Sequence, residues 1–424
     1  MDLIALAVPF FLLALLVELG VDTWRGTHYY RNSDAINSLS AGTLSTTVGY
    51  FTKFLPLIAW GFVLENFAIL DLPLAWFDAS PRGILLWVAA ALGWDFCYYW
   101  FHRLSHEYSL LWAAHVVHHQ SEDYNLSTAL RQTSTGFLFG WLFYLPLFLL
   151  GFPLEVLVTV NAVNLIYQFW VHTRHIDRLG PLDYIFVTPS NHRVHHARNE
   201  RYLDRNYGGM FILWDRWFGT FEDESSDEPV VYGTRKPLNS WDPVWANLQV
   251  YEGLWFDARH TARWRDKLRV WVSRTGWRPE DMRQRFPERS ETGSLDVRFD
   301  PQAAPGISWY AFAQFLVAVV LTLTIARLFA DGGPGMVLLP CLFLWAQLWT
   351  IGLLNEGRPE AVRYERLRLV FVGPGLLAIG VWTGLPLEGP GLVVALGYLG
   401  MSLLGLTVAE RTRKQLIKAS SNTT

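Results

Sequence analysis

Histidine is concentrated in one part of this chain. Ten of the twelve histidines lie between His102 and His196, in the segments FHRLSH, HVVHH, WVHTRH and HRVHH. These segments contain an HxxxH motif once and an HxxHH motif twice. Residues three and four apart share one face of a helix, so each motif predicts two or three imidazoles aimed at one point. That geometry is typical of a metal site built from helices.

The number of histidines predicts more than one metal ion. Neutral imidazole binds Zn, Cu, Fe and Ni. A closed zinc site takes four ligands, so eight or nine convergent imidazoles exceed what one ion needs. Cysteine is absent from all four segments, which favours a redox or catalytic metal over structural zinc. Isolated histidines are more often core or surface residues, so His28 and His260 are assigned no role.

The segments that must position these histidines are apolar. Of the 424 residues, 51% are hydrophobic, 15% aromatic and 17% charged, which is more apolar than a typical soluble protein. A net charge of −3, with no basic run interleaved with aromatics, argues against binding to nucleic acid. Cys97 and Cys341 lie far apart in hydrophobic segments and predict no disulfide framework.

Three apolar runs in the first quarter of the chain predict membrane spans. Residues 3–19 lack a basic flank and a cleavage site, so they predict a retained anchor. Residues 39–67 predict a tilted or kinked span, and residues 84–101 predict a third. The third run leads directly into His102 and therefore predicts the first histidine motif at the membrane surface.

Two shorter apolar runs predict a hairpin. Residues 137–150 and 153–171 are separated by GFP, which is a turn signal. A hairpin that enters the bilayer and returns would bring His172 back to the side where the third span ends. The polar stretch at residues 121–134 precedes this hairpin and is predicted to lie at the surface.

The rest of the chain predicts a soluble block followed by a membrane bundle. Residues 172–306 are soluble in character, and four apolar runs follow at residues 308–328, 335–354, 369–385 and 392–408. Under the positive-inside rule, the histidines lie on the cytoplasmic face. The predicted fold is an all-α integral membrane protein, a multi-span helical bundle with a cytoplasmic histidine-rich cap. Its predicted domains are residues 1–83 (membrane helices), 84–306 (catalytic region) and 307–424 (C-terminal bundle).

Asp95 is an ionisable residue inside the third predicted span, about two turns before His102. Such a residue is a candidate functional group by default, which makes Asp95 a candidate catalytic residue. The alternative is an interfacial carboxylate that pairs with Arg103 or a nearby Tyr. The sequence leaves both interpretations open.

The histidine segments resemble a known family. WDFCYYWFHRLSHE, AAHVVHHQSEDYNLSTALRQT and FWVHTRHIDRLGPLDYIFVTPSNHRVHHARN are similar to segments of the fatty acid hydroxylase and sterol desaturase superfamily of membrane di-iron enzymes. The resemblance is close over residues 94–224. It implies that Glu107 matches an acidic position and orients an imidazole as a candidate catalytic group. It also implies nine metal ligands, namely His102, His106, His115, His118, His119, His172, His192, His195 and His196.

Two departures from the family pattern concern substrate identity more than the metal site. Asn191 stands where the most similar branch often has another histidine. Arg174 and His175 replace a more usual acidic residue after WVHT. His175 lies three residues after His172, and whether it is a tenth ligand stays open.

The resemblance implies a function, since the family's members are O2-dependent enzymes. The expected activity is a di-iron lipid monooxygenase with two Fe ions, in a bacterial inner membrane or the endoplasmic reticulum. The most similar branch cleaves alkylglycerol ether lipids to a fatty aldehyde and a glycerol derivative. Its electron donor is tetrahydrobiopterin; an electron-transfer protein is the other candidate donor. The alternatives are a sterol or other lipid hydroxylase or desaturase with the same site, and a histidine-rich metal transporter.

Overall fold

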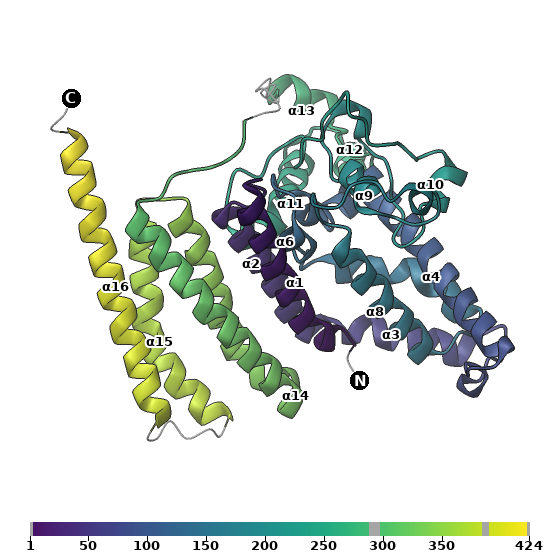
Figure 1. Ribbon diagram of the computed structural model, residues 1–424, viewed down its shortest axis with the longest axis horizontal. Coiled ribbons are helices and arrows are strands. Elements are labelled where there is room, and N and C mark those ends of the chain that lie inside the picture. Colours follow the sequence, from purple (N-terminus) through teal and green to yellow (C-terminus); the bar gives the residue numbers. More distant parts are fainter. Residues whose placement is uncertain (1–2, 288–296, 384–389, 422–424) are drawn as a thin grey trace. The chain divides into compact units, whose positions relative to one another are not determined.

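The computed structural model describes residues 3–287, 297–383 and 390–421, and nearly all of its regular structure is helical (Figure 1). Within these ranges, β-structure is limited to three isolated bridges. The predicted all-α fold class is therefore confirmed. Contacts divide the chain into two compact units. The histidine unit comprises Met1–Leu39, Thr52–Leu238 and Asn247–Arg298, and the C-terminal unit comprises Ser40–Phe51, Asn239–Ala246 and Phe299–Thr424.

The histidine unit is built from long and short helices. The α-helices are α1 (Leu3–Arg25), α3 (Phe54–Phe67), α4 (Pro81–Glu107), α5 (Ser109–Ala113), α6 (Leu126–Ala129), α7 (Leu145–Leu149), α8 (Leu154–Trp170), α9 (Pro189–His195), α10 (Leu213–Phe218), α12 (Trp264–Val272) and α13 (Glu280–Arg285). The 3₁₀ helices are η1 (Leu74–Trp76), η2 (Val116–His119), η3 (Gly136–Leu138), η4 (Gly140–Tyr144), η5 (Gly180–Tyr184) and η6 (Glu200–Tyr202). The helices α2 (Asn32–Thr52) and α11 (Pro243–His260) contribute residues to both units.

Aromatic residues join α3, α4 and α7 in the core of the histidine unit. Trp94 of α4 stacks on Tyr144 with ring centroids 3.9 Å apart, and Trp60 of α3 stacks on Phe148 of α7 at 5.0 Å. Each large aromatic ring buries about 150–250 Å² and therefore contributes several kcal/mol. This packing holds α4 in place, and α4 carries the first histidine motif.

Several helices are long and apolar enough to cross a membrane. They are Leu6–Arg25, Pro81–Glu107 and Pro305–Asn355, and the bent pair of α2 and α3 forms a fourth if it is counted as one span. The bend of 49° between α2 and α3 agrees with the predicted kink in residues 39–67. The protein is an integral membrane protein, as its composition predicts.

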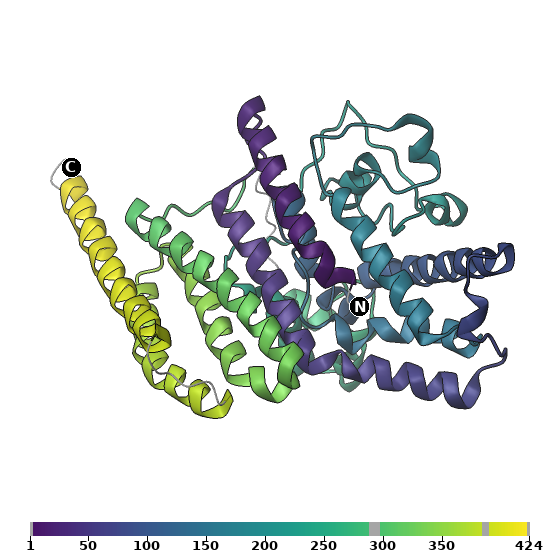
Figure 2. The same cartoon turned by 60° about the horizontal axis from the view of Figure 1, so that its bottom comes forward.

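The C-terminal unit contains α14 (Pro305–Asn355), α15 (Ala361–Thr383) and α16 (Pro390–Ser421). The chain reverses within α14 at Gly333, whose φ of 71° and ψ of −166° are not helical. Glycine adopts this backbone conformation without a steric penalty, and Pro334 follows it. The two halves of α14 lie side by side in both views (Figures 1 and 2), which confirms the two runs predicted at residues 308–328 and 335–354. The end of the run predicted at residues 369–385 lies outside the described residues.

One local prediction is wrong. The polar stretch predicted at the surface is interior, because residues 121–129 are all buried. Their polar groups are paired inside the protein; the Asp123 carboxylate, for example, accepts a hydrogen bond from Arg31 at 2.8 Å. The first arm of the predicted hairpin, residues 137–150, consists of the short helices η3, η4 and α7, with Phe139 between the first two. The returning arm forms α8.

Candidate metal centre

The first histidine motif lies at the C-terminal end of α4. This helix begins at Ser80, whose hydroxyl accepts a hydrogen bond from the Gly83 N–H at 3.1 Å, with Pro81 in its first turn. After 27 residues it ends at the motif, where His102 and His106 lie one turn apart and are both buried. The helix therefore delivers two imidazoles into the interior of the unit.

Each HxxHH motif divides its histidines between two clusters. In HVVHH, the first and last histidines belong to one cluster and the middle histidine belongs to the other. HRVHH divides in the same way, with the clusters exchanged. Two imidazoles of each motif therefore lie in one cluster, and the middle imidazole of each HxxHH motif lies in the other, because positions i+3 and i+4 point about 100° apart around a helix axis. The five-histidine cluster is His102, His106, His115, His119 and His195, and the four-histidine cluster is His118, His172, His192 and His196.

The four-histidine cluster is compact. In each cluster, the candidate ligand atoms all lie within 4.8 Å of one another. The Nε2 atom of His172 lies 3.3 Å from that of His118, 3.0 Å from that of His192 and 3.2 Å from that of His196. All four imidazoles are buried and come from three separate segments of the chain.

The five-histidine cluster has the same character. The Nε2 atoms of His102 and His115 are 3.1 Å apart, and those of His115 and His119 are also 3.1 Å apart. The Nε2 atoms of His106 and His195 are buried, and neither has a hydrogen-bond partner in the described structure. A buried polar atom without a partner is unfavourable, and binding to a metal ion would satisfy both atoms.

Backbone carbonyls fix the orientation of four of these rings. The Nδ1–H of His118 donates to the Arg131 carbonyl at 2.9 Å, and that of His172 donates to the Gln168 carbonyl at 2.8 Å. A neutral imidazole that donates from Nδ1 has only a lone pair at Nε2. His118 and His172 therefore face each other with two lone pairs, and a cation between them would satisfy both. The same anchoring is made by His102 with Tyr207 and by His195 with Arg205.

Burial keeps the histidines neutral. It lowers the pKa of His118 to about 4 and the pKa of His195 to about 3. Burial and the neighbouring imidazoles also hold the pKa well below 6.5 in five other residues, which are His115, His119, His172, His192 and His196. Metal ligation requires neutral imidazole, so the clusters are suited to binding metal at neutral pH.

A glutamate in α1 supports the four-histidine cluster. Glu18 accepts hydrogen bonds from the hydroxyls of Thr173 and Tyr30 and, at 2.7 Å, from the Leu126 N–H. Thr173 is the neighbour of His172, so the carboxylate holds the segment that carries this ligand. Glu18 is not among the residues predicted from the sequence. An ionisable residue inside an apolar run is nevertheless a signal of a functional or structural role.

Asp95 is a structural junction. Its carboxylate accepts hydrogen bonds from Asn164 at 2.8 Å, from the Met210 and Phe211 N–H groups at 2.7 and 3.1 Å, and from Trp214 at 2.9 Å. These partners fasten the loop before α10 to α4 and α8. The predicted alternative, a pair with Arg103 or a Tyr, is not among the contacts of Asp95 in the described structure. No imidazole is among these partners, and a catalytic role for Asp95 stays a prediction.

Glu107 contacts arginines. Its carboxylate accepts from the Arg103 Nε at 2.8 Å and from Arg274. No imidazole N–H that donates to Glu107, as its predicted orienting role requires, is among the contacts of the described structure. Instead, the backbone carbonyls of His106 and Glu107 accept from Thr275, from its hydroxyl at 2.6 Å and its N–H at 3.0 Å. The neighbourhood of Glu107 therefore holds the end of α4 against residues 274–275.

The other residues singled out in the sequence lie outside both clusters. His175 faces Asp22 at 3.9 Å, and Arg174 covers the ring of Tyr29 at 3.9 Å. Asn191 is buried and donates to two backbone carbonyls at 3.1 Å. His260 is exposed. These residues support the surroundings of the site or lie away from it.

An ion pair not predicted from the sequence supports the last motif. Arg193, inside HRVHH, is bonded through two nitrogens to Glu224 at 2.8 and 2.7 Å. It also donates to the carbonyls of Thr173 and Ile176 at 3.1 and 2.7 Å. One side chain thus ties α9 to the segment after His172. Its position between ligand candidates was the available signal.

Comparisons with known proteins agree with this site. The profile of the family described as Fatty acid hydroxylase matches residues 87–220, which include every histidine of both clusters. The chain is 39% identical to alkylglycerol monooxygenase of Homo sapiens over 371 residues, which are 87% of this chain and 81% of that protein. It is 37% identical to alkylglycerol monooxygenase of Danio rerio over 372 residues, with 86% and 80% covered. It is also 34% identical to an ornithine lipid hydroxylase of Rhizobium tropici over 149 residues, or 35% and 45%. No solved structure matches the chain.

Proposed function

Because this chain belongs to the alkylglycerol monooxygenase family of fatty acid hydroxylases, we propose that it oxidises an alkylglycerol lipid at the carbon bonded to the ether oxygen. The protein is a membrane-embedded lipid monooxygenase, and its histidine clusters and family indicate iron binding. The proposal adds the substrate, two irons and the electron donor.

The observation that carries the di-iron proposal is the division of nine imidazoles into groups of five and four. In each group the Nε2 atoms converge, and Nδ1–H groups bonded to carbonyls fix several rings. A set of lone pairs facing one another fits a cation and is repulsive without one. The proposed ligands are the nine histidines of the two clusters, one iron for each cluster.

The protein contributes position, neutrality and exclusion of water. Burial maintains the imidazoles as neutral ligands, and the carbonyl partners keep their lone pairs directed inward. Bound iron would supply the chemistry for inserting one oxygen atom of O2 into a C–H bond, while the other oxygen atom leaves as water with two electrons from an external donor and two protons. Hydroxylation beside the ether oxygen gives a hemiacetal, which collapses to a fatty aldehyde and a glycerol derivative.

Two further parts of the proposal rest on the family and on the charge distribution. Tetrahydrobiopterin is the proposed electron donor, supported by the family resemblance. The proposed location of the metal centre is the cytoplasmic face, supported by the excess of arginine and lysine in the segments that share its side of the predicted topology. An assay with purified components distinguishes a pterin from an electron-transfer protein as donor.

Metal analysis and lipid analysis test the proposal. We expect about two irons per purified chain, one for each cluster. In His118→Ala and His195→Ala we expect lower iron content and at least a hundredfold lower activity, because even groups that only orient a ligand contribute about 10–100-fold. His260→Ala is the matched control, since His260 is exposed and should leave both quantities unchanged.

The substrate is tested separately. Membranes from cells that lack the protein should accumulate alkylglycerols, and purified protein supplied with O2 and tetrahydrobiopterin should release a fatty aldehyde from them. Full activity of either cluster variant would contradict the di-iron assignment. Unchanged ether lipids together with altered sterols would contradict the substrate assignment and leave the metal assignment standing.

A further inference from the structure

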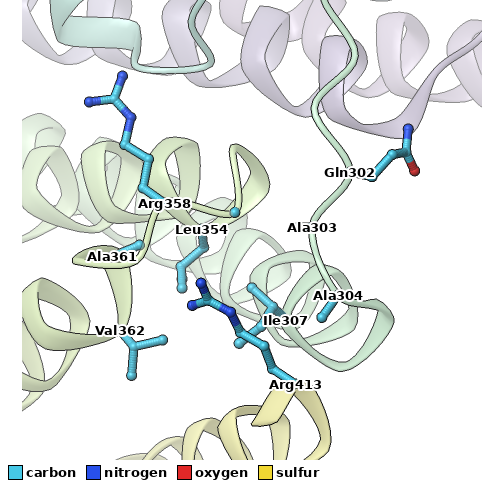
Figure 3. A pocket seen from close by; sticks show the side chains of 10 residues that line it. Gln302, Ala303, Ala304, Ile307, Leu354, Arg358, Ala361, Val362 and Arg413 are labelled. Atoms are coloured by element: carbon cyan, nitrogen blue, oxygen red, sulfur yellow. The ribbon is translucent and has the colours of Figure 1, made fainter. Parts of the chain in front are cut away.

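A pocket lies at one end of the C-terminal unit, away from the histidines in sequence and in chemistry. Its volume is about 360 Å³ (Figure 3). Four of the residues around it are buried apolar side chains. These are Ile307, Leu354, Ala361 and Val362. The remaining lining residues include Gln302, Ala303 and the arginines Arg358 and Arg413.

The pocket gathers the ends of apolar helices. The first turn of α14 contributes Ile307, and the last turn contributes Leu354, so both ends of this reversed helix meet at the pocket. The start of α15 contributes Ala361 and Val362. Because α14 is long and apolar enough to cross a membrane, a place where its two ends meet lies at the boundary between hydrocarbon and water.

Arg413 of α16 provides a positive charge inside the pocket. Figure 3 shows its guanidinium extending toward Leu354 and Ile307. It takes part in no ion pair or hydrogen bond within the described part of the chain. Gly306 keeps the helices close here, since a Cβ at this residue would lie 3.3 Å from the Cα of Ala409. Ala409 is one turn before Arg413, so this close contact directs Arg413 over the pocket.

Arg358 has a different place at the same pocket. Its Nε donates to Glu356, its side chain is 43% exposed, and it extends away from Leu354 in Figure 3. It therefore contributes positive potential at the rim. The pocket thus offers one unpaired guanidinium against an apolar wall, with a second arginine outside.

We propose that this pocket binds the phosphate-bearing head group of an anionic phospholipid. Guanidinium is the side chain best suited to phosphate, because its planar set of donors matches two phosphate oxygens. The apolar wall and the position at a helix end fit an amphipathic ligand, and basic pockets between membrane helices are typical sites for such head groups. This site lies in the C-terminal unit and does not depend on the proposed activity.

Lipid titration of the detergent-solubilised full-length chain, followed by native mass spectrometry, tests the site. The probe is phosphatidylglycerol, compared with phosphatidylcholine and with diacylglycerol, which lacks phosphate. Arg413→Gln should weaken phosphatidylglycerol binding by about 10–100-fold, the value of a charge-assisted hydrogen-bonded contact. Arg411→Gln is the matched control, because Arg411 is exposed on the same helix and does not line the pocket.

The control separates a site from general attraction to a charged surface, which changes affinity only about fivefold for any basic residue near the membrane. Arg411→Gln should retain nearly full binding, and Arg413→Lys should restore part of what Arg413→Gln loses. Equal weakening by the two glutamine variants would overturn the proposal. Glycerol phosphate that binds as tightly as phosphatidylglycerol would also overturn it, in favour of a free anion. An unchanged unfolding temperature of Arg413→Gln verifies that this variant folds. If it does not fold, phosphatidylglycerol binding is compared between Arg413→Lys and Arg411→Lys instead, and equal weakening again overturns the proposal.

Discussion

Each unit of this protein has buried polar side chains packed among its helices. The histidine unit contains the two clusters. The C-terminal unit contains an ion pair between Glu365 and Arg368, whose side chains are 1% and 5% exposed. Hydroxyl and amide groups from the other helices of that unit surround this pair. Both sets place costly groups in the interior, but their hydrogen bonding differs.

The ion-pair network is complete within itself. Glu365 accepts from Tyr310 at 2.6 Å, from Thr350 at 2.8 Å and from two nitrogens of Arg368 at 2.6 and 2.7 Å. Arg368 also donates to Gln314 at 3.1 Å. Every charge has an opposite charge or a dipole beside it, which is how buried polar groups join membrane helices.

The histidine clusters are incomplete in the same terms. The Nε2 atoms of His106 and His195 have no partner in the described structure, and those of His118 and His172 face each other with lone pairs. A closed network of this kind joins helices, whereas unpaired imidazole nitrogens are suited to binding a cation.

The largest expected effect is the loss of stability when the buried ion pair between Glu365 and Arg368 is broken. Glu365→Gln leaves the Arg368 charge without a counter-charge, and breaking a buried ion pair costs about 3–5 kcal/mol. We expect this loss in the free energy of unfolding of the solubilised protein. The iron content should not change, since no cluster histidine contacts this pair in the described structure.

The matched control for this variant is an exposed pair in the same unit. Asp331 pairs with Arg327 at 3.0 Å, and the two side chains are 51% and 78% exposed. Asp331→Asn should change the free energy of unfolding by no more than about 1 kcal/mol. Equal effects of the two variants would show that burial and completeness do not distinguish the ion-pair network.

The next effect is the pH dependence of the stability of the metal-free protein, which the buried histidines cause. His118 has a pKa lowered to about 4 by burial, whereas an unfolded histidine has a pKa of about 6.5. Between these values the unfolded chain binds a proton that the folded chain does not. Stability is therefore full above about pH 6.5 and is lost as the pH falls, by about 1.4 kcal/mol per pH unit for each such histidine.

For His118 alone, the loss amounts to roughly 3 kcal/mol by pH 4. Thermal unfolding of chelator-treated protein across this range measures it. The His118→Ala variant should show a shallower pH dependence. A flat profile between pH 6.5 and 5 would mean that the clusters are not held neutral by burial.

The sequence predicted the membrane helices and the histidines that form the two clusters, since hydropathy and residue type are local properties. It did not predict how the histidines divide. That division depends on how η2 and α9 pack, since the middle histidine of each HxxHH motif joins the opposite cluster. Motif spacing describes one helix, whereas the clusters are made between helices.

The sequence also misplaced polar residues whose partners are distant in the chain. Residues 121–129 are polar in composition, which favoured the surface, yet they are buried by contacts with α1 and α2. Glu18 and Asp34 supply the acceptors, about 90 to 110 positions earlier. Composition shows which polar groups would cost free energy if they were buried. It does not show the distant hydrogen-bond partner that offsets this cost.

The smallest expected effect comes from Glu18, which shares a feature with each of the two sets of buried polar side chains. Its carboxylate is satisfied by three donors, as in the ion-pair network, but one donor, Thr173, adjoins the ligand candidate His172. Glu18→Gln retains the shape and loses an acceptor. We expect about tenfold weaker binding of the iron in the four-histidine cluster, because groups that orient a ligand contribute about 10–100-fold to metal affinity.

Chelator competition measures this affinity, and a double variant locates the effect. In the His118→Ala background, Glu18→Gln should cause little further loss of iron, since both changes act on the four-histidine cluster. In the His195→Ala background, its loss should be added in full. Thr23→Val, at an exposed position on α1, is the matched control and should leave iron binding unchanged. Additive losses in both backgrounds would mean that Glu18 stabilises the fold generally and does not position His172.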